Sequence, residues 1–82
     1  MFIKIKDKNA NVLINSNYVT SFETVEFKDN PGKYYLAIYY STNPNIEEFY
    51  FDNSSFEKIT DIMRTIERGI AIGTRIIDLS NF

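Results

Sequence analysis

Two residue types are missing from this chain of 82 residues: it has no cysteine and no histidine. The lack of cysteine excludes disulfides, thiolate nucleophiles and zinc fingers, and the lack of histidine excludes an imidazole base. No segment approaches the roughly 18 consecutive apolar residues of a membrane helix. The N-terminal residues alternate between apolar and basic, without the apolar block of a signal peptide. We therefore expect a cytoplasmic protein with no membrane association.

Motifs that carry chemistry are missing as well. The sequence contains no nucleotide-binding loop, nucleophile elbow or dinucleotide-binding pattern. Glu47 and Glu48 are adjacent in a predicted strand and would point to opposite faces, which does not suit a shared metal ion. The turn at Asp29 lacks the spaced oxygen ligands of a calcium loop. We expect a protein that is not an enzyme and that uses no metal and no cofactor.

Aromatic residues, in contrast, are abundant: seven Phe and six Tyr make up 16% of the chain. The chain is 44% hydrophobic and 24% charged, as in an ordinary globular domain, and its length fits one domain, 1–82. The formal net charge of −2 argues against tight binding of double-stranded nucleic acid, which depends on clustered Lys and Arg.

Alternation of apolar and polar residues predicts a series of strands before residue 51. The first predicted strand is 2–6, and a second strand begins with residues 12–14. Three more are predicted within 18–28, 33–40 and 46–51, the first of them with a turn or bulge near its start. Asn30-Pro31-Gly32 has the residues of a type II turn, and 41–45 predicts a second turn.

One helix is predicted over 54–69, where apolar residues recur at spacings of three and four. Ser54 and Glu57 form a capping box at its start, and Gly69 is suited to end it. The tail, 70–82, either adds a short strand at 75–79 or lies against the helix. The predicted fold is α+β: an antiparallel meander of four or five strands with the helix packed on one face.

The strand 33–40 is aromatic on both of its faces. Tyr34, Leu36, Ile38 and Tyr40 alternate with Tyr35, Ala37 and Tyr39. One helix of about 16 residues spans roughly 24 Å and can cover only one face of such a sheet. We therefore expect tyrosines on an open face, where they would bind a protein partner or a second copy of the chain. The candidate partner-binding residues are Tyr35, Tyr39, Tyr50 and Phe2.

Two alternative functions remain open at this point. Lys4, Lys6 and Lys33 could join the tyrosines on the open face and bind single-stranded nucleic acid, through stacked bases and neutralised phosphates. The chain could also be an inhibitor of a host enzyme, encoded by a phage or a mobile element.

The order of these segments resembles that of short bacterial and phage proteins in which a hairpin, two strands and a helix follow one another. The matching positions are Ile14-Asn15, Val19, Ser21-Phe22, Phe51-Asp52-Asn53-Ser54 and Glu57. Small flagellar regulators of the FlbD type have a similar layout, and some pleckstrin-homology-like folds also end a sheet with a helix. The resemblance covers 1 to about 68 and implies a non-enzymatic regulatory or adaptor role, with no catalytic residues.

Overall fold

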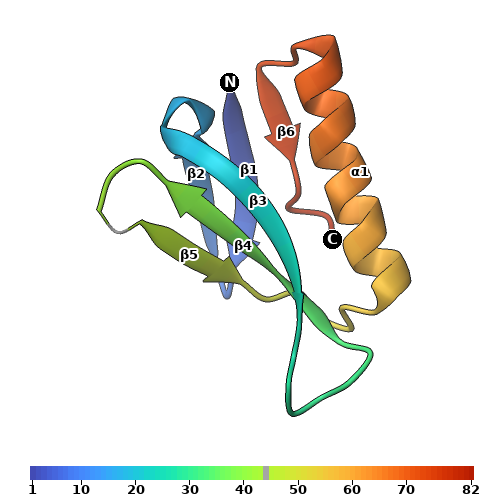
Figure 1. Cartoon of the computed structure of the whole chain (residues 1–82). Helices are drawn as coiled ribbons and strands as arrows, with labels where there is room; N and C mark the ends of the chain where they lie inside the picture. The colour runs from blue at the N-terminus through green and yellow to red at the C-terminus, as the bar shows by residue number, and fades with distance from the viewer. Residues whose placement is uncertain (44) are drawn as a thin grey trace.

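The computed structural model describes residues 1–43 and 45–82. These residues form an α+β fold with six strands in two three-stranded sheets and one long helix (Figure 1). In chain order the elements are β1 (Phe2–Asp7), β2 (Ala10–Asn15), the 3₁₀ turn η1 (Ser16–Tyr18), β3 (Val19–Glu26), β4 (Tyr34–Tyr40), β5 (Ile46–Phe49), α1 (Phe56–Ile72) and β6 (Ile76–Asp78). Within the described residues, no helix combines the length and the apolar character that crossing a membrane requires.

The first sheet has the order β2–β1–β6 and is mixed, because β1 pairs antiparallel with β2 and parallel with β6. The second sheet, β3–β4–β5, is antiparallel throughout. The α+β class is confirmed, but the single antiparallel meander that we expected is wrong. After the η1 turn, β3 pairs with β4 and not with the hairpin, and β6 takes the free edge of β1. The tail therefore does form a strand, and β6 also contacts α1.

Two local predictions for the connections between strands are confirmed. The β3–β4 register shifts between Val19 and Ser21, near the start of the segment 18–28, where a turn or bulge was predicted. In the turn that follows β3, Gly32 has φ +85° and the Lys33 N–H donates to the carbonyl three residues earlier, as in a type II turn. Pro44, in the predicted turn 41–45, lies outside the described residues.

The helix begins and ends later than predicted. Its N-cap is Ser55, whose side chain accepts a hydrogen bond from the Lys58 N–H at 3.2 Å; the buried Ser54 instead accepts one through its carbonyl from the Tyr34 N–H. The C-cap is Gly73, with φ +69°. Gly69 does not end the helix: it is buried inside it, where the Ile77 side chain of β6 packs against its backbone.

One core lies between the two sheets and the helix. Its buried residues are Ile3, Ile5 and Ile14 from the first sheet, Leu36, Ile38 and Phe49 from the second, Phe51, then Ile59, Ile62 and Ile66 from α1, and Ile77 and Leu79 from the tail. Figure 1 shows the β1–β2 hairpin behind the β3–β4–β5 sheet and α1 at the side, next to β6. The helix and the first sheet thus share the cover of one face of β3–β4–β5.

Candidate binding surface

The register of β4 decides which of its two aromatic faces points outward. Leu36 and Ile38 are fully buried in the core, so Tyr35 and Tyr39 lie on the opposite, outer face of the sheet. We call this outer face the tyrosine face. It consists of Ser21, Glu23, Val25 and Phe27 from β3 and its end, Tyr35, Ala37 and Tyr39 from β4, and Ile46, Glu48 and Tyr50 from β5 and its end.

Three aromatic rings form a cluster at one end of the tyrosine face. The ring centroids of Phe27 and Tyr35 are 4.9 Å apart, those of Tyr35 and Tyr50 are 5.4 Å apart, and those of Phe27 and Tyr50 are 5.6 Å apart. These separations are in the favourable range for aromatic pairs. Phe27 was not among the predicted site residues. It follows Glu23 and Val25 at every second position, which places it on the same face of the strand.

Two carboxylates flank the rings. Glu23 and Glu48 both lie opposite Ala37 in the strand register, one from each neighbouring strand. The Tyr50 hydroxyl donates a hydrogen bond of 2.6 Å to Glu48. Glu47, the residue before Glu48 in β5, accepts a hydrogen bond from the Tyr40 hydroxyl on the inner side instead. The prediction that the two adjacent glutamates point to opposite faces is therefore confirmed.

The carboxylates perturb the tyrosine hydroxyls around them. The charge of Glu23 is the main cause that raises the pKa of Tyr39 above its ordinary value. The hydrogen bond to Glu48 raises the pKa of Tyr50. Desolvation and then the Glu48 charge raise the pKa of Tyr35. All three shifts favour the neutral phenol, as expected where negative charge is close by.

The remaining predicted site residues do not join the tyrosine face. Phe2, Lys4 and Lys6 alternate with buried residues of β1 and lie on the outer face of the other sheet. Lys33 precedes β4, and its ammonium group donates a hydrogen bond to the Asn53 side chain at 2.9 Å. The structure therefore brings Tyr35, Tyr39 and Tyr50 together, but it places the lysines of the nucleic-acid hypothesis elsewhere.

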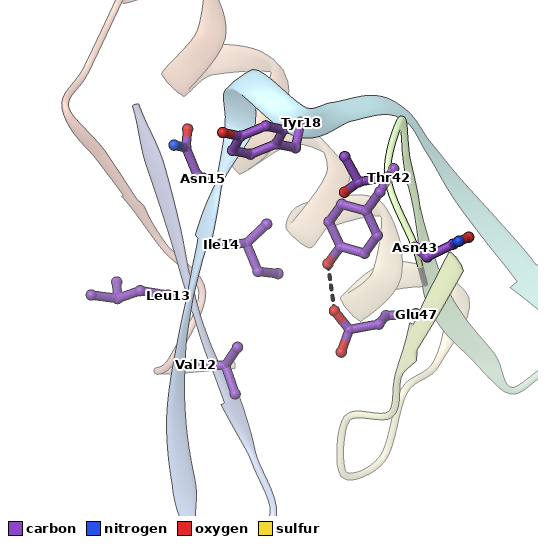
Figure 2. A pocket seen from close by; sticks show the side chains of 9 residues that line it. Val12, Leu13, Ile14, Asn15, Tyr18, Thr42, Asn43 and Glu47 are labelled. Atoms are coloured by element: carbon purple, nitrogen blue, oxygen red, sulfur yellow. Dashed lines mark hydrogen bonds between the residues drawn. The ribbon is translucent and has the colours of Figure 1, made fainter. Parts of the chain in front are cut away.

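A groove of about 250 Å³ opens between β2 and the adjoining ends of β4 and β5 (Figure 2). Figure 2 shows the Val12 and Ile14 side chains of β2 on one side of this groove and Glu47 on the other. Glu47 is engaged by the Tyr40 hydroxyl at 2.8 Å. Burial and this carboxylate raise the pKa of Tyr40, which keeps the phenol protonated as the donor. The groove is smaller than the roughly 300–1,000 Å³ of typical small-molecule sites.

Comparison of the chain with protein-family models, with curated proteins and with solved structures finds no match. Function is therefore inferred from the surface chemistry alone. The tyrosine face differs from the groove in having a cluster of three rings together with two exposed carboxylates, Glu23 and Glu48. It is the better candidate for recognition of a large partner.

Proposed function

We propose that this protein is a non-enzymatic regulatory or adaptor domain that binds another protein through its tyrosine face. The observation that carries the proposal is that the core is complete on the inner side of β3–β4–β5, whereas no element of the described chain covers the rings on the outer side. Tyrosine is enriched at the centres of protein interfaces, because its ring buries a large area and its hydroxyl still finds a partner.

A symmetric homodimer through this face is less favourable than a contact with a different protein. The tyrosine face includes Glu23 and Glu48 but no lysine or arginine. Face-to-face packing of two copies would bring four carboxylates into one interface with no cation to offset them, and like charges at an interface are unfavourable. The same carboxylates would repel the phosphates of a nucleic acid.

The proposal is tested by capture on the immobilised protein from a cell extract. Three proteins are compared: the wild type, the double variant Tyr35→Ser with Tyr39→Ser, and the control Tyr18→Ser. Tyr18 is 52% exposed but lines the groove of Figure 2 and not the tyrosine face. We expect one protein to bind the wild type and the control, and to be lost from the double variant.

The stability of the double variant completes this test. Because both rings lie on an outer face, the two substitutions should lower the free energy of unfolding by no more than about 2 kcal/mol. Capture that survives the double substitution would contradict the proposal. Loss of the folded state would contradict it too, since it would show that the rings are required for folding.

A further inference from the structure

Among the described residues, no ion pair neutralises the charge of the tyrosine face. Among residues 1–43 and 45–82, the ion pair that the structure contains is Arg64–Asp61, on the surface of α1. Glu23 and Glu48 are exposed and have no basic side chain beside them on their face. This face therefore combines aromatic rings with two uncompensated negative charges.

The four groups surround a single small residue. Ala37 has Tyr35 and Tyr39 two positions away on either side along β4, and Glu23 and Glu48 opposite it on the neighbouring strands. Strand spacing places the two glutamate backbones about 10 Å apart and the two tyrosine backbones about 13 Å apart. Ala37 itself is only 1% exposed, so these larger side chains converge above it.

Rings and carboxylates arranged in this way suit one class of ligand. The face of a tyrosine ring attracts an ammonium or guanidinium group, and a carboxylate pairs with the same cation. The aliphatic part of a lysine or arginine side chain can also lie against the rings. An apolar segment would cover both carboxylates without supplying a cation, and an acidic segment or a phosphate would be repelled.

We propose that the partner presents a basic segment, with a lysine or arginine side chain that lies against the Tyr35 and Tyr39 rings, on top of the side chains that cover Ala37, and pairs with Glu23 and Glu48. This inference rests on the proposed function and adds the chemistry of the partner. A second copy of the chain is a weaker candidate for the occupant. A second copy could offer Lys4 and Lys6, on the outer face of the β2–β1–β6 sheet. Lys4, however, already has the carboxylate residue Asp78 directly opposite it on the neighbouring strand.

The probe for this inference is a short, fluorescently labelled peptide of alternating lysine and serine, with a glutamate–serine peptide as its counterpart. Binding is followed by fluorescence anisotropy at several salt concentrations. We expect the wild type to bind the lysine peptide and not the glutamate peptide. The affinity should fall as salt rises, because exposed ion pairs are screened.

Two matched double variants localise the binding. Glu23→Gln with Glu48→Gln removes both charges but keeps an acceptor for the Tyr50 hydroxyl. We expect it to weaken binding of the lysine peptide about fivefold or more, since each exposed ion pair contributes modestly. Glu57→Gln with Glu67→Gln makes the same change in net charge on α1, where both residues are exposed, and should shift the affinity less than about twofold.

Several results would overturn the inference: equal binding of both peptides, unchanged affinity of the Glu23→Gln/Glu48→Gln variant, or binding of a thymidine oligonucleotide in preference to the lysine peptide. Concentration-dependent self-association in light scattering that this variant abolishes would identify a second copy as the occupant and overturn it as well. If the lysine peptide does not bind but capture still depends on Tyr35 and Tyr39, the basic partner is wrong and the proposed function stands. If the lysine peptide does not bind and the wild type captures no protein in a way that depends on Tyr35 and Tyr39, both the inference and the proposed function are wrong.

Discussion

Glu23 and Glu48 lie in one row of the β3–β4–β5 sheet, one on each side of Ala37. This row places carboxylates close to three phenol groups on the same face. The Glu23 charge is the main cause that raises the pKa of Tyr39, and the hydrogen bond to Glu48 is the main cause for Tyr50. For Tyr35, desolvation and then the Glu48 charge raise the pKa. The arrangement accounts for the electrostatics of the face, and its effect can be measured without knowledge of the partner.

Alkaline titration should detect this effect directly. Because the folded state holds these phenols above the ordinary pKa of 10.0, their contribution to stability is complete below about pH 10 and is lost as the pH rises through the folded-state values. We expect the tyrosinate absorbance to rise at a higher pH in the folded protein than in the protein unfolded by urea. The free energy of unfolding should fall above pH 10. In the Glu23→Gln/Glu48→Gln variant the titration should move back toward 10.0, and an unchanged curve would contradict this account.

The contact between α1 and β6 gives a prediction about stability. A methyl group at Gly69 would lie 2.5 Å from Cγ1 and 2.8 Å from Cδ1 of Ile77, closer than atoms can approach. Alanine normally stabilises a helix by about 1 kcal/mol relative to glycine, but here we expect Gly69→Ala to lower the free energy of unfolding by about 1–2 kcal/mol. Urea denaturation measures this difference.

A double-mutant cycle separates the clash from any effect on the helix itself. In an Ile77→Ala background the two clashing atoms are gone and the next neighbour, Thr74 Cγ2, lies at 3.2 Å, so most of the cost of Gly69→Ala should disappear. All four proteins are compared in the same stabilising osmolyte, since loss of the buried Ile77 side chain alone costs about 2–5 kcal/mol. Additive effects of the two substitutions would show that the helix does not depend on this close approach.

The position of the helix cap gives a prediction with a neighbouring control. Ser55 accepts a hydrogen bond from the Lys58 N–H, and Ser54 contributes its backbone carbonyl to Tyr34. Replacement of Ser55 by alanine should lower the free energy of unfolding by about 1 kcal/mol, whereas Ser54→Ala should cost less, because it keeps that carbonyl. Thermal denaturation by circular dichroism compares the two variants. A larger loss for Ser54→Ala would place the cap one residue earlier.

Local patterns predict most of the strands and turns, because they depend on residues close together in the chain. Alternation predicts β4 and its two aromatic faces, and Pro31-Gly32 predicts the type II turn that the structure contains. What these patterns cannot provide is pairing between distant segments. The partner of β1 on its second edge is β6, more than seventy residues later, and only this return explains why Gly69 is a packing position and not the end of the helix.

For the same reason, the sequence predicts only part of the candidate site. Alternation places Tyr35 and Tyr39 on one face of β4, but it does not say whether that face or the face of Leu36 is buried. The decision comes from the core, where the isoleucines of α1 and of the first sheet meet Leu36 and Ile38. The division into two sheets also moves Phe2 and the lysines of β1 to a different surface, which no pattern within β1 reveals.

The most direct test of the central claim is a titration of the isotope-labelled protein with the lysine–serine peptide, followed by nuclear magnetic resonance. The account predicts that backbone amide shifts concentrate around Ala37 and its row neighbours, Glu23 and Glu48. The amides of Lys4 and Leu13, on the outer face of the other sheet, should not move. Shifts centred on that other sheet or on the groove of Figure 2 would contradict the claim that the tyrosine face binds a basic partner.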